Sequence, residues 1–195
     1  MTTIGWAIAM GLAGLSDAPD SHRSPDTAWQ HTLDHTPFRF ANEEASILFS
    51  LGQYTGDPEV HMVYHPRKGR RSLELRFVRD DKVILVLAGH TYSAFRTDRN
   101  ILYFAHFWPS STGCELAAYD LVTGQQLWRT KLKGIDGAMH SAYFNRVTVE
   151  LGDGAVFVQG HETFGDYTEV VDKKSGKVLA HRVYRRDRGG SDETK

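Results

Sequence analysis

The sequence predicts an all-β protein built from antiparallel, four-stranded, blade-like repeat units. Three observations lead to this fold class. Apolar and polar residues alternate with a period of two, most clearly over residues 73–77 and 147–151, which is the pattern of a half-buried strand. A turn signature occurs twice, at residues 120–124 and 172–176, and an internal repeat indicates the architecture of a chain. No sustained helical periodicity is present after residue 45.

The N-terminal segment, residues 1–37, is expected to be a leader or poorly structured. Residues 4–15 form an apolar run that is too short to span a bilayer as a helix. No lysine or arginine precedes the run and no clear small-residue cleavage site follows it, so the features of a signal peptide are incomplete. Residues 16–26 have the composition of a linker. These features favour a cytoplasmic over an exported protein and predict no membrane span.

A single all-β domain is expected over residues 38–188, followed by a disordered tail at residues 189–195. Its units are expected at about residues 45–88, 91–132 and 141–184. The first unit is degenerate, with strands expected near residues 47–51, 61–64, 73–78 and 83–87. The last of these strands is continuously apolar, which predicts that it is covered on both faces.

The second and third units share the turn sequence Asp-x-x-Thr/Ser-Gly before their last strand. The glycines supply the left-handed backbone that a tight connection needs. The aspartates are expected to accept hydrogen bonds from backbone N–H groups of the same turn, and the hydroxyl residues add weaker bonds. This structural role accounts for both carboxylates without metal binding or acid–base chemistry. The structural turn residues are Asp120, Thr123, Gly124, Asp172, Ser175 and Gly176.

Residues 116–128, which read L-A-A-Y-D-L-V-T-G-Q-Q-L-W, resemble the repeat of the PQQ-like (quinoprotein-type) β-propeller families. In those families a strand, a D-x-x-T-G turn and a strand ending in Leu-Trp form part of each blade, and the tryptophan packs between neighbouring blades. Trp128 holds that position here, and Ala180 replaces it in the next unit. The resemblance covers about residues 91–184. The families it implies range from quinone-dependent dehydrogenases to non-catalytic assembly scaffolds.

The length of the chain argues against a complete propeller. Closed propellers have about four to eight four-stranded blades, whereas this chain offers two clear units and one degenerate unit. The cofactor pocket at the centre of a large ring has nowhere to form, so no cofactor is expected. We expect an incomplete propeller-like stack, a β-sandwich or an open barrel. A homo-oligomer joined through sheet edges, or a fragment of a larger propeller, is the alternative.

The composition limits the expected partners. The 195 residues carry 23 Lys and Arg against 24 Asp and Glu, so no overall field attracts nucleic acid. The basic stretch at residues 66–71 is interpreted as a solvated hairpin loop. Cys114 is the only cysteine, so the chain cannot form an internal disulfide. Its side chain is expected to be buried. On a strand, His61 and His65 lie about 13 Å apart, too far for a metal pair.

Two histidines are candidates for a site. His106 and His161 occupy similar places in the two clear units, each just after the central apolar strand. If the units bring them together with carboxylates, the chain is a small hydrolase or a metal-dependent enzyme. Hydrogen bonding to loop backbone at strand ends is the favoured interpretation. No phosphate-binding, zinc-protease or nucleophile-elbow motif is present, and no catalytic or metal-binding residue is assigned.

The favoured function is a non-catalytic binding or scaffolding module whose partners are proteins. Its recognition surface is expected at the loop of residues 107–114 and its counterpart at residues 162–166. Exposed aromatic side chains in such loops are typical of partner surfaces. The candidate binding residues are His106, Phe107, Trp108, His161, Glu162 and Asp166.

Overall fold

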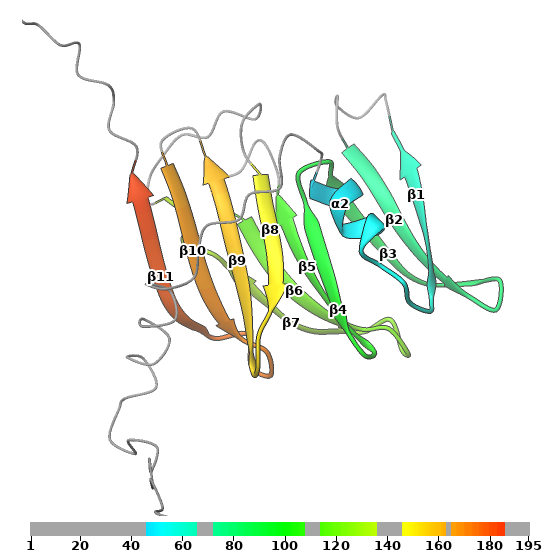
Figure 1. Ribbon diagram of the computed structural model, residues 1–195. Coiled ribbons are helices and arrows are strands. Elements are labelled where there is room, and N and C mark those ends of the chain that lie inside the picture. The colour runs from blue at the N-terminus through cyan, green and yellow to red at the C-terminus, as the bar shows by residue number, and fades with distance from the viewer. Residues whose placement is uncertain (1–45, 66–71, 108–113, 136–145, 163–164, 186–195) are drawn as a thin grey trace, which may run out of the picture.

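A computed structural model describes residues 46–65, 72–107, 114–135, 146–162 and 165–185. These residues form one short helix and three antiparallel sheets, without a closed barrel (Figure 1), which confirms the all-β fold class. The elements are α2 (Ser46–Gly52), β1 (Glu59–Tyr64), β2 (Ser72–Arg79), β3 (Lys82–His90), β4 (Ala94–Asp98), β5 (Ile101–Phe107), β6 (Cys114–Asp120), β7 (Gln126–Lys131), β8 (Arg146–Leu151), β9 (Ala155–Glu162), β10 (Gly165–Asp172) and β11 (Val178–Arg185).

The strands form three consecutive meanders, as the repeat predicts. The first sheet has the order β1-β2-β3, the second β4-β5-β6-β7 and the third β8-β9-β10-β11. Residues 141–143, expected to open the third unit, lie outside the described residues, as do the N-terminal segment and the tail. The first described strand of that unit is β8. The helix in the described residues is too short to cross a membrane.

The prediction of a strand at residues 47–51 is wrong, because this segment forms helix α2. Ile47 and Ser50 are both buried, and a spacing of three places them on one face of a helix. A short, mostly apolar segment does not distinguish a helix from a strand by periodicity. The Ser50 hydroxyl oxygen accepts a hydrogen bond from the Phe95 N–H at 3.1 Å, which fixes the helix to the second sheet.

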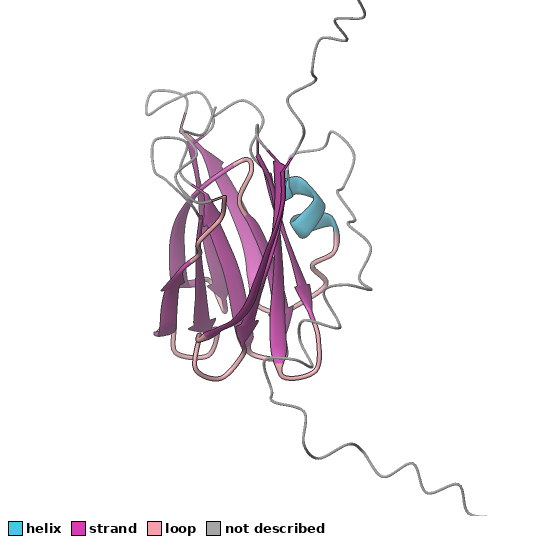
Figure 2. Ribbon diagram, turned by 90° about the vertical axis from the view of Figure 1, so that its left-hand side faces the viewer, coloured by secondary structure: helices cyan, strands magenta, loops and turns pink. Residues whose placement is uncertain are grey.

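The three sheets pack face to face, with the second sheet in the middle (Figures 1 and 2). One of its faces packs on the first sheet and α2, around Phe77 and Phe104. Its other face packs on the third sheet, around Leu116 and Val149. The strands of all three sheets lie roughly along one axis, so the turns that connect them gather at the two ends of the stack (Figure 2).

The layer order explains which strands are buried. Tyr103 and Phe104 in β5 are both buried, because the second sheet is covered on both faces. The expectation that β3 is covered on both faces is wrong. Val83 and Val86 are 52% and 49% exposed, because β3 belongs to an outer sheet and only one of its faces meets another layer.

The two turn signatures have the same hydrogen bonds. Asp120 Oδ1 accepts from the N–H groups of the second and third following residues at 2.6 and 3.1 Å. Asp172 Oδ1 accepts the equivalent bonds at 3.2 and 2.7 Å. Gly124 and Gly176 have φ of 72° and 73°, the left-handed conformation that favours glycine. The hydroxyls of Thr123 and Ser175 each accept a bond from the N–H two residues later, at 3.3 Å.

Each of these turns also lies against the preceding sheet. A Cβ added to Gly124 would stand 2.0 Å from the backbone oxygen of Ile84 in β3. A Cβ added to Gly176 would stand 2.7 Å from the ring of Trp128 in β7. The Trp128 indole N–H also donates to the Lys173 carbonyl at 2.9 Å. Trp128 therefore lies between the second and third sheets.

Candidate functional site

A hollow of about 310 Å³ lies between the first and second sheets. Three consecutive residues of β3 line one side of it. Because side chains of a strand alternate between its faces, three consecutive lining residues mean that β3 turns its edge toward the hollow. The second sheet provides the opposite wall from β5, β6 and β7. The lining residues are Val86, Leu87, Ala88, His106, Glu115, Ala117, Tyr119 and Arg129.

The strand registers explain why the polar residues of this hollow converge. Glu115, Ala117 and Tyr119 alternate along β6 and so share one face of the sheet. His106 of β5 pairs with Glu115, and Arg129 of β7 pairs with Ala117. Five side chains from three neighbouring strands thus form one wall, which faces the edge of β3.

The polar groups of the hollow are neutral or paired. Arg129 and Glu115 form an ion pair. Burial, assisted by the nearby Arg129 and opposed by Glu115, lowers the pKa of His106 to about 4. Burial also raises the pKa of Tyr119. The charge of Arg129 opposes this shift, and the charge of Glu115 adds to it. At neutral pH His106 and Tyr119 are therefore uncharged, and they offer hydrogen-bonding groups beside an apolar rim. A histidine with such a low pKa is poorly matched to general base catalysis at pH 7.

His106 and His161 do not share a site. Ile101 pairs with Asp120 and Ala155 pairs with Asp172, so Ile101 and Ala155 are equivalent positions in the two units. His106 is the fifth residue after Ile101, and the fifth residue after Ala155 is Gly160, not His161. A shift of one residue moves a side chain to the opposite face of a strand. His106 faces the first sheet, whereas His161 lies on the outer face of the third sheet. The expectation that the two histidines occupy similar places is therefore wrong.

His161 has a local partner in the third sheet. Its Nδ1 lies 2.7 Å from Asp166 Oδ1, because the two residues are opposite each other on β9 and β10. The structure thus brings together two of the predicted binding residues. Phe107 and Glu162 end their strands, but their side chains lie outside what the structure describes, as does the whole of Trp108.

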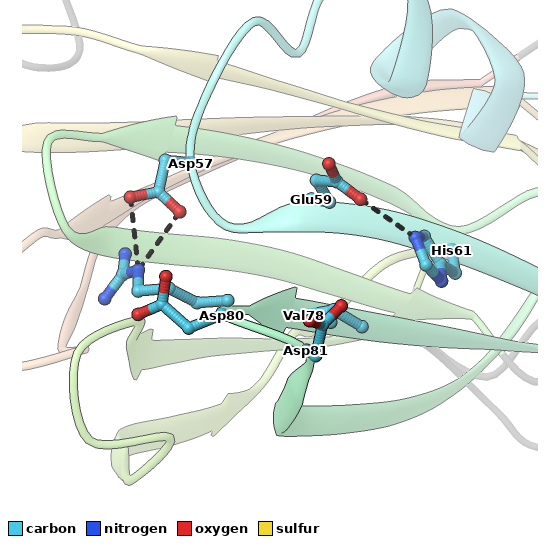
Figure 3. A pocket seen from close by; sticks show the side chains of 7 residues that line it. Asp57, Glu59, His61, Val78, Asp80 and Asp81 are labelled. Atoms are coloured by element: carbon cyan, nitrogen blue, oxygen red, sulfur yellow. Dashed lines mark hydrogen bonds and ion pairs between the residues drawn. The ribbon is translucent and has the colours of Figure 1, made fainter.

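A second hollow, of about 470 Å³, lies at the turn end of the first sheet and is rich in carboxylates (Figure 3). Asp57 accepts hydrogen bonds from Arg79 Nε at 3.0 and 3.2 Å. Glu59 lies 3.2 Å from His61 Nε2. Asp80 of the β2–β3 turn also lines this hollow. Within the described ranges, no three His, Cys, Asp or Glu side chains are arranged to hold a metal ion.

A buried carboxylate ties the connection after β7 to the third sheet. Glu169 is fully buried, and its Oε1 accepts a hydrogen bond from the Gly134 N–H at 2.7 Å. His181 Nε2 donates to the Gly134 carbonyl at 2.7 Å. Burial raises the pKa of Glu169, although the Gly134 N–H and His181 oppose this shift. The Oε2 atom is buried without a hydrogen-bond partner in the described part of the chain.

Replacing this carboxylate by an amide is expected to stabilise the protein at neutral pH. A raised pKa means that the folded state binds the proton more tightly, so stability is lost as the pH rises from the ordinary carboxyl range through the folded pKa. Glu169→Gln keeps an acceptor for Gly134 and removes the charge. We expect its free energy of unfolding at pH 7 to exceed that of the wild type by about 1–2 kcal/mol. The gain should disappear near pH 4, where the wild-type carboxyl is protonated.

Urea unfolding followed by circular dichroism at several pH values measures this effect. Glu150→Gln, at an exposed position of the same sheet, is the matched control and should change stability by less than about 0.5 kcal/mol. A Glu169→Gln variant that is less stable than the wild type at pH 7 would show that the carboxylate stabilises the folded protein.

The sequence did not identify Glu115, Tyr119 and Arg129 as candidates. They follow no motif, and only the alternation along β6 and its pairing with β7 indicates that they share a face. No protein-family model matches the chain, and a search of curated proteins finds none that matches it.

Proposed function

We propose that this protein is a non-catalytic binding module that captures an extended segment of a partner protein along the edge of β3. The hollow beside that edge is the observation that carries the proposal. Its volume of about 310 Å³ is at the lower end of the range of about 300–1,000 Å³ typical of ligand pockets. It also combines an apolar rim with a few polar groups, as binding sites do.

The edge of β3 is suited to pairing with another strand. Among the described strands β3 pairs only with β2. An unpaired edge presents backbone N–H and C=O groups that a partner strand can bind. The first sheet has three strands and the other two sheets have four each. One added strand would give the first sheet the same number. That strand would lie against the wall formed by Ala117 and Tyr119.

The side chains of the hollow favour a partner segment of low charge. His106 is neutral at physiological pH, and Arg129 is paired with Glu115. Val86 offers an exposed apolar contact at the strand edge. A segment that alternates apolar and hydrogen-bonding residues could place one set against Val86 and the other against Tyr119, because its side chains point to both faces of the extended sheet.

The resemblance to PQQ-like repeats supports a scaffold function. The repeated turns, and the position of Trp128 between two sheets, are what the resemblance leads one to expect of blades. The three described sheets form an open stack (Figure 1). The non-catalytic scaffolds among those families are the comparison on which this proposal draws.

Selection from a random peptide library displayed on phage tests the proposal. The full-length protein should enrich extended peptides, and Val86→Glu should weaken their binding at least about tenfold, because it puts a charge beside the pairing edge. Val122→Glu is the matched control: Val122 is 55% exposed and Val86 is 49% exposed, but Val122 does not line the hollow. Failure to enrich any peptide, or equal binding to both variants, would refute the proposal.

A further inference from the structure

The edge strand β3 has the composition of an aggregation-prone segment. Residues 83–88 read V-I-L-V-L-A, without a charge or a proline. Both faces of the strand are apolar. Leu85 and Leu87 are buried on the inner face, whereas Val83 and Val86 are exposed on the outer face. Segments of this kind pair with other chains when they lie at the edge of a sheet, so folded proteins usually protect them.

The usual means of protection are missing from most of β3. Charged side chains, prolines and bulges protect edge strands. For comparison, β7 is an edge strand of the second sheet and carries Arg129 and Lys131. In β3 the only Lys, Arg, Asp or Glu is Lys82, at the first position. The one shift in the pairing of β3 with β2 falls at Ile84, and residues 85–90 pair regularly. Protection of this edge must therefore come from another element.

The second sheet projects beyond β3 as a shelf, which consists of β6 and β7. Phe95 of β4 packs on Phe77 of β2, with ring centroids 6.1 Å apart, and β5 is the strand of the second sheet in closest contact with β3. Strands β4 and β5 thus lie against β2 and β3. The order β4-β5-β6-β7 then places β6 and β7 past the edge. At about 4.8 Å per strand, the shelf extends about 10 Å beyond β3.

The shelf prevents a second copy of this chain from pairing antiparallel with β3. A closed dimer joins the same edge of both copies about a two-fold axis. Antiparallel pairing of two β3 strands would keep both inner faces on one side of the joined sheet, so both shelves would occupy the same layer. Paired strands are about 4.8 Å apart, whereas each shelf extends about 10 Å. The two shelves would therefore overlap.

We propose that the shelf makes the β3 edge selective for an isolated extended segment, because it excludes a second copy of this chain. This selectivity depends on the proposed capture of a strand by β3 and specifies which strands fit. A lone strand brings no second layer with it. It can therefore lie on the shelf over Ala117 and Arg129, which are opposite each other on β6 and β7, while its backbone pairs with β3.

The charges of the shelf favour an uncharged segment. The Arg129 guanidinium is paired with the Glu115 carboxylate, and an incoming charge would have to break this ion pair. On the outer face of β3, Val86 and Ala88 are exposed beside the place of the added strand. Alternating threonine and valine meets both requirements, because these residues carry no charge and have high β-propensity.

Fluorescence anisotropy with a labelled peptide of four Thr-Val repeats tests the selectivity. Methylation of alternate amide nitrogens, on the threonines in one peptide and on the valines in another, leaves one edge able to pair and prevents the peptide from forming sheets of its own. We expect at least one of these peptides to bind the full-length protein. The peptide methylated at every amide should bind at least about tenfold more weakly. Sedimentation equilibrium should show a monomer over the same range of protein concentration.

Two substitutions test whether the peptide lies on the shelf. Ala117→Phe adds a ring above the shelf, and Val122→Phe adds the same ring at an exposed position that does not line the hollow. We expect Ala117→Phe to weaken binding at least about tenfold, because the ring fills the space of the incoming strand. Val122→Phe should leave binding unchanged. Circular dichroism checks that both variants are folded, and if Ala117→Phe is not, the methylated peptides and the sedimentation result decide.

The outcomes separate this selectivity from the proposed function. A dimer that Val86→Glu disrupts would overturn the selectivity alone, because a second copy would then reach the β3 edge. Equal binding to a folded Ala117→Phe variant, or equal binding of the fully methylated peptide, would also overturn it, since the peptide would not pair with β3 on the shelf. The same holds if neither alternately methylated peptide binds although the phage library yields binders. Failure of the phage selection would refute the proposed function itself.

Discussion

Gly124→Ala is expected to lower the free energy of unfolding by about 3 kcal/mol, from two costs that add at one position. The left-handed backbone, with φ of 72°, costs a residue with a Cβ about 1–2 kcal/mol. The new methyl group would also stand 2.0 Å from the Ile84 backbone oxygen. Backbone cannot swing aside as a flexible side chain does, so the turn must move away from the first sheet at a cost of about 1–3 kcal/mol.

Gly154→Ala separates the two costs. Gly154 has φ of 71°, but a Cβ there would meet nothing within 4 Å. It should therefore show only the conformational cost, about 1–2 kcal/mol. Urea unfolding of both variants, followed by far-ultraviolet circular dichroism, measures the difference. Equal losses of stability would mean that the close approach of the turn to β3 contributes nothing, and that the two sheets are less tightly joined than described.

Trp128→Ala is expected to lower the free energy of unfolding by about 2–4 kcal/mol, somewhat below the range for a fully buried tryptophan because this ring is partly exposed. The ring packs over Gly176, and its centroid lies 6.0 Å from that of Tyr103. Its N–H donates to Lys173 at 2.9 Å. The substitution therefore removes both packing and a hydrogen bond between the second and third sheets.

Trp128→Phe keeps an aromatic ring and removes the N–H group. It should lose about 1 kcal/mol, the usual net value of one hydrogen bond, together with a smaller packing loss. Circular dichroism is the suitable probe, because the chain has four tryptophans and loss of one changes the fluorescence directly. A Trp128→Ala variant as stable as the wild type would show that the tryptophan does not hold the two sheets together.

The repeat could be recognised in the sequence because its turns are local structures. Asp120 and Gly124 determine a turn through hydrogen bonds and backbone conformation within five residues, and Asp172 and Gly176 do the same. The alternation over residues 147–151 likewise predicts β8. These features depend on neighbours in the chain, so they can be predicted before any tertiary contact is known.

The candidate site could be predicted only in part. His106 was a candidate, and it lines the hollow beside β3. Its neighbours Glu115 and Arg129 were not, because strand pairing brings them together rather than proximity in sequence. The grouping with His161 failed because a difference of one residue in register places the two histidines on opposite faces of their sheets.

The sequence by itself determined most of the strands, the glycine turns and the two complete four-stranded units, because a period of two and a tight turn are properties of short segments. Only the tertiary structure decided which faces are covered. Phe104 is buried and Val86 is exposed, although both belong to apolar strands, because the second sheet has a neighbour on each side and the first has one. Alternation divides the residues of a strand between two faces, but the packing of distant sheets determines which of those faces meets water.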